Sequence, residues 1–354
     1  MIQKVKLYNF RSYDLFETEL GESGTVIVGP NGTGKTNLLE AIYVALRGNS
    51  FRGTLGDCMR HHETQTIIHL ETDNQPRRVQ LLATSNGSIA KEFIIADSRS
   101  KLLARKHRLP VVLFEPNELR LISSSPQRRR DFLDGLLSRL DMKYDSQLRT
   151  FNRTLLQRNE LLKHHDSHSV NWRNHLFAWD VKFIQAAHTL VAARTQFLSR
   201  YQETLGGIYN SLAGRQTPFS IEYLPSVSLD LYEQSLLDRL QRTRDYEIAA
   251  GHTSAGPHRE DFLIYLHSRP ANKVASRGEM RTIMLAFKLL ELKLQTERTN
   301  SRPLILMDDV FSELDATREK LLQETIREHQ FIVTTTDSRH KADDCLIIST
   351  QAAQ

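Results

Sequence analysis

The sequence is poor in cysteine and contains no long apolar run. Its 354 residues include only two cysteines, Cys58 and Cys345, which lie far apart and form no CxxC pair. This argues against both a disulfide framework and a cysteine zinc site. No apolar stretch approaches the roughly 18 residues that a membrane-spanning helix needs, and the first residues lack the apolar core of a signal peptide. We therefore expect a cytoplasmic protein without a membrane partner.

Internal repeats and low-complexity segments are also missing from the sequence. The residues that are present, 40% hydrophobic and 25% charged, exclude wholesale disorder and allow a substantial core. The length exceeds one average domain and favours two lobes. The net charge of +5 permits contact with a polyanion without establishing it.

The two ends of the chain are rich in strand-like segments. Alternation or short apolar runs predict strands at residues 3–8, 15–20, 25–28, 66–70, 78–83, 92–95, 111–114 and 262–266, and buried parallel neighbours at 304–307 and 331–333. Helical spacing predicts helices at residues 37–46, 128–140, 143–163, 171–201 and 278–294. The pattern predicts an α/β lobe made from residues 1–117 and 250–354, interrupted by an α-helical lobe at residues 118–249.

A glycine-rich loop is the strongest motif. Residues Gly29–Thr36 match GxxxxGK[ST] completely and lie between a predicted strand and a predicted helix, which makes a chance glycine turn a weak alternative. Glycines let backbone N–H groups converge on phosphate oxygens, and the helix start adds unpaired donors. Lys35 would neutralise the β- and γ-phosphates, and the Thr36 hydroxyl would ligate Mg²⁺. The predicted nucleotide-binding residues are Gly29, Pro30, Asn31, Gly32, Thr33, Gly34, Lys35 and Thr36.

The apolar run Leu304–Met307 ends in two acids, Asp308 and Asp309. In P-loop folds, a buried strand that ends in a carboxylate holds the metal opposite the phosphate loop. We assign Asp308 to the metal side, directly or through water, and Asp309 to orienting or deprotonating the attacking water. Taken alone, two adjacent acids more often begin a surface turn, but the phosphate loop reverses that preference.

Two segments resemble ABC-type ATPases. Met307–Asp315 resembles the part that joins the acidic strand to a dimer-contact loop, and Ser276–Arg281 resembles the signature motif at a helix start. The resemblance implies that the signature grips the γ-phosphate of ATP held by a second subunit. The implied signature residues are Ser276, Arg277, Gly278 and Glu279, and the implied dimer-loop residues are Ser312 and Asp315. Ser276 and Glu279 also fit a plain capping box, and both interpretations can hold together.

Four further blocks narrow the resemblance to one branch. Leu7–Tyr13 is similar to the opening of RecF, SMC and Rad50-like proteins, while 48–52, 127–134 and 254–261 resemble the RecF family specifically. The blocks occur in order over nearly the whole chain, and the long coiled coils of SMC and Rad50 proteins are absent. The fold that this implies is an ABC-type, Rad50/SMC-head-like P-loop ATPase lobe with an inserted α-helical lobe. It also implies that Arg11 reaches the nucleotide, with a surface arginine as the alternative.

Resemblance to the RecF family implies ATP and Mg²⁺ as cofactors, slow ATP hydrolysis and dimerisation on ATP. It implies binding to double-stranded or gapped DNA, work with RecR and RecO, and loading of RecA during recombinational repair and the SOS response. The chain departs from ABC enzymes in carrying Asp309 where many have Glu, and Thr334–Asp337 where a switch histidine is expected. Two alternatives stay open: a phosphotransferase or nucleotide-dependent regulator without DNA binding, and a scaffold that binds ATP without turnover.

Two basic clusters are candidates for DNA contact. One contains Arg99, Lys101, Arg105, Lys106, His107 and Arg108, and the other contains Arg128, Arg129 and Arg130. Clustered cations neutralise phosphates without reading sequence, although either cluster alone is as often a solvated face. Glu115, near Asn117, follows a strand where ABC proteins place a metal-sensing loop and is a candidate metal-site residue. The histidine pairs 61–62 and 164–165 are interpreted as surface residues, and Trp172 and Trp179 as packing residues.

Overall fold

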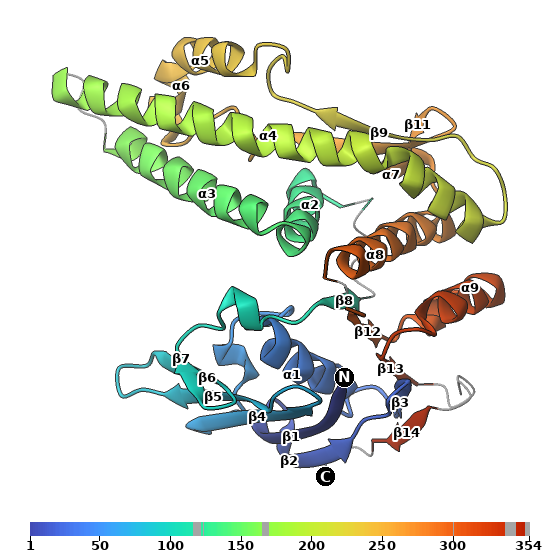
Figure 1. The fold of residues 1–354 in the computed structure, drawn as a ribbon. Helices are drawn as coiled ribbons and strands as arrows, with labels where there is room; N and C mark the ends of the chain where they lie inside the picture. The colour runs from blue at the N-terminus through green and yellow to red at the C-terminus, as the bar shows by residue number, and fades with distance from the viewer. Residues whose placement is uncertain (116–121, 123, 165–169, 300, 337–344, 351–354) are drawn as a thin grey trace. The chain divides into compact units, whose positions relative to one another are not determined.

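The computed structural model describes residues 1–115, 122, 124–164, 170–299, 301–336 and 345–350. The chain divides into two compact units, one formed by Met1–Glu118 with Leu292–Gln354 and the other by Leu119–Glu291 (Figure 1). Residues 250–291, which the sequence pattern places in the ATPase lobe, therefore lie in the second unit. Among the described helices, none is long and apolar enough to cross a membrane.

The first unit contains a six-stranded antiparallel sheet. Its order is β2-β1-β4-β5-β6-β7. The strands are β1 (Ile2–Phe10), β2 (Tyr13–Glu19), β4 (Gln65–Thr72), β5 (Arg77–Ala83), β6 (Ile89–Ile95) and β7 (Ser98–Ser100). Phe10 pairs with Tyr13, so the hairpin between β1 and β2 turns on Arg11 and Ser12 alone. Arg11 takes a positive φ of 51°, which a tight hairpin turn requires.

The second sheet of this unit is parallel and carries the motifs. Its order is β14-β3-β13-β12-β8. The strands are β3 (Gly24–Val28), β8 (Val111–Phe114), β12 (Leu304–Asp308), β13 (Phe331–Thr335) and β14 (Leu346–Ser349). β12 pairs in parallel with β13, which confirms the predicted neighbours. Parallel pairing brings the carboxyl ends of β3, β12 and β13 to one edge of the sheet.

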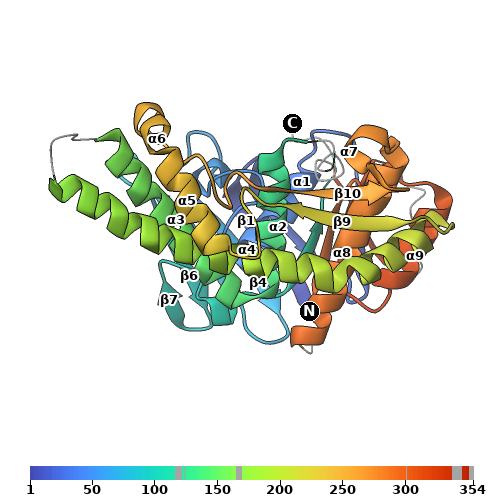
Figure 2. The ribbon, with the colours of Figure 1, turned by 90° about the horizontal axis from the view of Figure 1, so that it is seen from above.

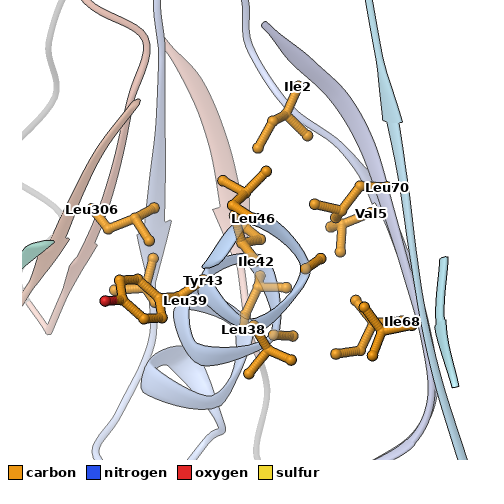
Figure 3. Packing of buried hydrophobic residues seen from close by; sticks show 14 of the residues in the cluster. Ile2, Val5, Leu38, Leu39, Ile42, Tyr43, Leu46, Ile68, Leu70 and Leu306 are labelled. Atoms are coloured by element: carbon orange, nitrogen blue, oxygen red, sulfur yellow. The ribbon is translucent and has the colours of Figure 1, made fainter. Parts of the chain in front are cut away.

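Helix α1 (Lys35–Arg47) lies between the two sheets and forms the core of the first unit. Figure 3 shows Leu306 of β12 on one side of the helix and Val5 and Ile68 of the antiparallel sheet on the other. Leu38 and Ile42 are fully buried between them. Helix α9 (Ala316–Ile326) follows β12. The apolar run after the glycine-rich loop therefore anchors that loop to both sheets.

The second unit combines helices with a small sheet. Its helices are α2 (Pro126–Leu140), α3 (Met142–Lys163), α4 (Val170–Ala213), α5 (Tyr232–Arg242), α6 (Arg244–Ala250) and α7 (Ala271–Val274), and its strand order is β11 (Arg269–Pro270), β10 (Asp261–Leu266), β9 (Phe219–Leu224). Figure 2 shows α4 running beside α3 and past β9. Helix α8 (Arg277–Thr299) begins in this unit and ends in the first.

The sheet of the second unit explains why the predicted domain boundary differs from the observed one. β10 pairs with β9 over six residues, from Asp261 opposite Leu224 to Leu266 opposite Phe219. The alternate residues Phe262, Ile264 and Leu266 are buried. Because its partner strand lies outside the ATPase motifs, β10 belongs to a mixed helix-and-sheet unit.

A buried charge cluster ties three helices of the second unit together. The guanidinium of Arg158 on α3 donates to Asp180 on α4 and to Glu247 on α6, each at 2.7 Å. Its third nitrogen donates to the hydroxyl of Thr253 at 2.7 Å. The side chains of Arg158, Asp180 and Glu247 are 2% exposed or less. A buried charge must be paired and hydrogen-bonded, and this one is.

Candidate nucleotide-binding site

The glycine-rich loop follows β3 and ends where α1 begins. Gly32 and Gly34 have φ values of 84° and 91°, a left-handed conformation that glycine adopts without a side-chain clash. The Lys35 ammonium is nearly buried and donates to the carbonyls of Gly29 and Pro30, at 2.6 and 2.8 Å. Burial lowers the pKa of Lys35, and the nearby carboxylates of Asp309 and Asp308 offset part of that shift. The Lys35 ammonium, held by the loop, thus interacts electrostatically with both acids.

Thr36 and Asp308 meet at the carboxyl edge of the parallel sheet. The Thr36 hydroxyl lies 2.8 and 2.9 Å from the two carboxylate oxygens of Asp308, although the residues are 272 positions apart in sequence. Hydroxyl and carboxylate oxygens are the ligands that Mg²⁺ prefers, and Mg²⁺ commonly takes one or two carboxylates and completes its shell with phosphates and water. The donor set therefore fits the predicted magnesium site.

Asp309 directly follows β12 in a strained backbone conformation. Its φ is +48°, unusual for a residue with a side chain. Its N–H donates to the Thr334 carbonyl at 3.1 Å and to the Thr334 hydroxyl at 3.0 Å. Strained residues of this kind persist where the surroundings hold them, and they cluster at functional sites. The catalytic role of Asp309 stays a prediction.

The β1–β2 turn is hydrogen-bonded to the glycine-rich loop and to the first turns of α1. Tyr13 donates its hydroxyl to the Gly34 carbonyl at 3.1 Å, and the Asn37 amide donates to the Ser12 hydroxyl at 2.9 Å. Two guanidinium nitrogens of Arg11 donate hydrogen bonds to the Glu40 carboxylate oxygens, at 2.9 and 2.7 Å. Arg11 is thus a half-buried, ion-paired residue beside the loop rather than a solvated surface arginine. Its contact with nucleotide stays a prediction.

Glu40 is a site residue that the sequence reading missed. Its side chain is fully buried and also accepts from the Ser50 hydroxyl at 2.6 Å. The Arg52 guanidinium lies 4.0 Å away. The available signal was a lone acid inside the apolar run of α1, because a buried charge in such a run requires partners.

Gly34→Ala should destabilise the protein more than Gly32→Ala. Both positions force alanine into a left-handed conformation, at a cost of about 1–2 kcal/mol. At Gly34 an added Cβ would also lie 2.9 Å from the Ser12 hydroxyl and 3.0 Å from the Tyr13 ring, whereas at Gly32 it would meet nothing within 4 Å. Overpacking adds roughly 1–3 kcal/mol. Urea unfolding without nucleotide measures the difference, and equal losses would contradict the turn-to-loop contact.

The signature candidate lies at the start of α8, in the second unit. Ser276 and Glu279 form a complete capping box: the Ser276 N–H and hydroxyl contact the Glu279 carboxylate at 2.8 and 3.0 Å, and the Glu279 N–H reaches the Ser276 hydroxyl at 3.2 Å. Hydrogen bonds from Ser276 lower the pKa of Glu279, and Arg215 pairs with that carboxylate at 2.5 Å. Ser276 and Arg277 are exposed, while Gly278 is half-buried. The capping interpretation is confirmed, and the contact with a partner's nucleotide stays a prediction.

The predicted dimer-loop residues have local structural partners. The Ser312 hydroxyl donates to the Asp309 carbonyl at 2.7 Å, and Asp315 caps α9 by accepting from the Arg318 N–H at 2.9 Å. Glu115 is half-buried and follows β8, the neighbour of β12 in the sheet. Asn117 and Asp337 lie outside the described residues. The dimer contact and the metal role of Glu115 stay predictions.

One of the predicted DNA-contacting residues needs correction. Arg129 is buried, and its guanidinium pairs with the Asp261 carboxylate at 2.9 and 2.5 Å, so it is committed to an internal ion pair. Half-buried Arg130 donates to the Glu260 carbonyl at 2.7 Å. Arg128 and Lys106 are exposed and Arg105 is half-buried. Lys106 and Arg128 remain candidates for DNA contact, and Arg105 and Arg130 are less accessible candidates.

The histidines and tryptophans set aside in the sequence have ordinary surroundings. The His61 and His62 rings meet edge to face, with centroids 3.9 Å apart and an interplanar angle of 76°. Trp172 is buried and donates its indole N–H to the Leu161 carbonyl at 2.9 Å, which confirms its packing role. His165 lies outside the described residues. Within the part of the chain that is described, no group of three or more His, Cys, Asp or Glu side chains could hold a metal ion.

Comparison with known proteins settles the family. The model for the RecF/RecN/SMC N terminal domain matches residues 1–353. A protein of Agathobacter rectalis called DNA replication and repair protein RecF is 31% identical, over 95% of this chain and 92% of its own. This chain belongs to the RecF family. RecF proteins so named from Chlorobium phaeobacteroides and Bacillus mycoides are 32% and 33% identical, over 96% and 95% of this chain and 96% and 92% of theirs.

Solved structures agree with that assignment. A structure of the recombination mediator protein RecF with ATP, in the RecFOR pathway, superposes with a TM-score of 0.84 at 28% identity, covering 97% of this chain and 94% of that one. An Smc head domain from Pyrococcus furiosus gives a TM-score of 0.52 at 16% identity, covering 99% of this chain and 94% of that chain, and shows fold alone. The predicted ABC-type, SMC-head-like α/β fold is confirmed.

Proposed function

We propose that this RecF-family protein binds ATP with Mg²⁺ through Gly29–Thr36, hydrolyses it slowly to ADP and phosphate, and closes as an ATP-bound dimer on double-stranded or gapped DNA. The observation that carries the proposal is the contact of the Thr36 hydroxyl with Asp308 beside a complete phosphate loop. A RecF structure with ATP supports the nucleotide.

The chain's own groups account for binding of the phosphates. Backbone N–H groups of the loop and the start of α1 donate to phosphate oxygens. The Lys35 ammonium, held against the loop carbonyls at 2.6 and 2.8 Å, exchanges those acceptors for the β- and γ-phosphates. The turn carrying Arg11 is hydrogen-bonded to the same loop, and Arg11, which is paired with Glu40, would reach the nucleotide by giving up part of that ion pair. The antiparallel sheet thereby takes part in the nucleotide site.

Hydrolysis needs a metal-side ligand and a group that handles the attacking water. Thr36 and Asp308 would hold Mg²⁺, which neutralises the developing charge on the phosphate oxygens. Asp309 orients the water and accepts its proton as the water oxygen bonds to the γ-phosphorus and the bond to the β-phosphate oxygen breaks. An aspartate side chain is shorter than a glutamate side chain, so its carboxylate would lie farther from a bound nucleotide, which favours slow turnover.

Dimer closure would use the exposed helix tip of α8. Ser276 and Arg277 are exposed at a helix N-terminus, and the Ser276 hydroxyl would exchange its contact with Glu279 for a γ-phosphate offered by a second subunit, beside the Arg277 guanidinium. Ser312 and Asp315 follow the acid pair and would meet the partner across the same nucleotide. ATP then acts as a bridge between two copies, and its hydrolysis releases them.

DNA is the partner proposed for the closed dimer. Lys106 and Arg128 are exposed cations, and relatives named DNA replication and repair protein RecF support the assignment. By the same family argument, RecR and RecO are proposed as partners, with RecA loading on single strands as the outcome. The protein would thereby serve recombinational repair and the recovery of replication gaps.

DNA binding should require ATP and should weaken steeply with salt. A protein that neutralises six to ten phosphates loses about 10³–10⁵-fold in affinity between about 50 and 200 mM salt. Lys106→Gln should lower the slope of log affinity against log salt by about 1, because one phosphate contact is lost. Filter binding of a gapped duplex with a non-hydrolysable ATP analogue measures both effects. Arg242→Gln, at an exposed position on α5, is the control for a lost charge.

Two outcomes would contradict the proposal, one in the filter-binding measurement and one in a separate phosphate-release assay with hydrolysable ATP. An absence of binding at low salt, with nucleotide saturated, favours a phosphotransferase or regulator that touches no DNA. Binding without phosphate release, measured with and without DNA, favours a scaffold that holds ATP. Equal slopes for Lys106→Gln and the wild type remove Lys106 from the DNA-contacting set.

A further inference from the structure

The hydroxyl of Thr334 joins the two acids of the candidate ATPase site. Thr334 lies on β13 and is fully buried. Its hydroxyl donates to one Asp308 carboxylate oxygen at 2.8 Å and accepts from the Asp309 N–H at 3.0 Å. The parallel register places Thr334 directly opposite Asp308. One buried side chain therefore contacts both residues on which metal binding and hydrolysis are proposed to depend.

Strand propensity alone does not require a hydroxyl at this position. The preceding residues of β13, Phe331, Ile332 and Val333, are apolar and buried. Valine has nearly the shape of threonine and suits a buried strand equally well. A buried hydroxyl is favourable only where its hydrogen bonds are made, and here the two shorter contacts, at 2.8 and 3.0 Å, go to the acid pair, while the Met307 carbonyl lies 3.5 Å away.

The geometry gives Thr334 a distinct task at each acid. At Asp308 the Thr36 hydroxyl approaches both carboxylate oxygens, whereas Thr334 approaches only one. The carboxylate is thus held in one rotational setting with its second oxygen directed toward Thr36. At Asp309 the hydroxyl supplements the Thr334 carbonyl, and together they hold a residue whose φ is +48°. Such a conformation costs of order 1–3 kcal/mol and persists when neighbours fix it.

We infer that Thr334 is a positioning residue that orients the metal-side carboxylate of Asp308 and fixes the backbone of Asp309. This rests on the proposed ATPase function. The same strand end also receives a hydrogen bond from the phosphate loop, since the Gly29 N–H donates to the Thr335 carbonyl at 3.2 Å. The end of β13 thereby connects the start of the loop with both acids, at the place where ABC enzymes carry a switch histidine.

Thr334→Val tests the inference because it removes the hydroxyl and little else. Loss of an outer-sphere partner of a metal ligand typically costs about 10–100-fold in metal affinity or activity. We expect the Mg²⁺ concentration for half-maximal binding of a fluorescent ATP analogue to rise by about that factor, with Mn²⁺ binding by electron paramagnetic resonance as a second readout. Binding of the analogue in excess EDTA should stay within about twofold, because the loop and Lys35 are untouched.

Thr334→Ser restores the hydroxyl and should return the metal dependence to the wild-type value. Should Thr334→Val unfold, Thr334→Cys is the second variant, because it keeps a similar size with a weaker donor. Wild-type metal dependence in a folded Val or Cys variant would overturn the inference. So would a Ser variant that behaves like Val.

Asp308→Asn separates this inference from the proposed function. It should abolish the metal dependence more completely than Thr334→Val does. If Asp308→Asn changes metal dependence and Thr334→Val does not, the ATPase site stands and the role of Thr334 is wrong. If neither variant changes it, the metal site itself is wrong, and the inference falls with it.

Discussion

Asp309→Asn is expected to slow ATP hydrolysis by about 10²–10⁴-fold, the range for loss of a general base, while ATP binding is retained. The amide keeps the size of the carboxylate but accepts no proton at neutral pH. The backbone contacts that hold residue 309, from its N–H to Thr334, do not involve the side chain. The variant should therefore accumulate as an ATP-bound dimer on DNA.

In the same experiment, Lys35→Met should block the cycle at an earlier step, the binding of ATP. It removes the ammonium that contacts the loop and is proposed to bind the phosphates, so nucleotide should not be retained and no dimer should form. Sedimentation velocity with ATP and a labelled gapped duplex measures dimer and DNA together, and phosphate release measures turnover. Three states are expected: a cycling wild type, a trapped Asp309→Asn dimer and a monomeric Lys35→Met.

The result that would refute this mechanism is equally direct. A wild type that stays monomeric at saturating ATP and micromolar protein excludes ATP as the bridge. An Asp309→Asn protein that hydrolyses ATP at the wild-type rate transfers the water-handling role to another residue. In that case Glu115, half-buried after the adjacent strand β8, is the next acid to substitute.

Features encoded by neighbouring residues could be predicted from the sequence. The phosphate loop was predictable because glycines, lysine and threonine stand at fixed spacing between a strand and a helix. The pairing of β12 with β13 was predictable because short apolar runs without alternation are typical of buried parallel strands. The capping box at Ser276 and Glu279 follows from a three-residue spacing alone. The loop and the capping box depend on contacts within a few residues, and each of the two strands is recognised from its own short apolar run, although the strands pair across 26 positions, as Ile305 does with Phe331.

Features that depend on distant partners could not be predicted. Arg129 looked like a free cation in a basic run, and only its pairing with Asp261, 132 positions away, shows it to be internal. Phe219–Leu224 alternates apolar and polar residues, but spacing does not reveal that this strand, β9, pairs with β10, so the sequence pattern places β10 in the ATPase lobe and the structure places it in the second unit. Thr334 and Glu40 were missed for the same reason, because their partners come from other strands and turns. A side chain's role follows from its partner, which spacing does not reveal.

Arg158→Met should destabilise the second unit by about 3–5 kcal/mol, the usual cost of breaking a buried ion pair from one side. The substitution leaves Asp180 and Glu247 buried without their cation, and both are 2% exposed or less. Arg149→Met on the same helix is the matched control. Its ion pair with Asp145 is 3.3 Å long, and its side chain is 59% exposed, so a loss below about 1 kcal/mol is expected. Urea unfolding followed by circular dichroism compares the two.

The pH dependence distinguishes a charge effect from a packing effect. Burial already raises the pKa of Asp180, and Arg158 opposes that shift. Removing Arg158 should raise the folded-state pKa further above the unfolded value, so that the folded protein holds the proton more tightly. A carboxyl group of this kind contributes stability at low pH and loses it as pH rises through the folded-state pKa. The loss of unfolding free energy caused by Arg158→Met should therefore be smaller at pH 5 than at pH 8. A loss that is the same at both pH values would show that Arg158 acts through its packing and not through its charge.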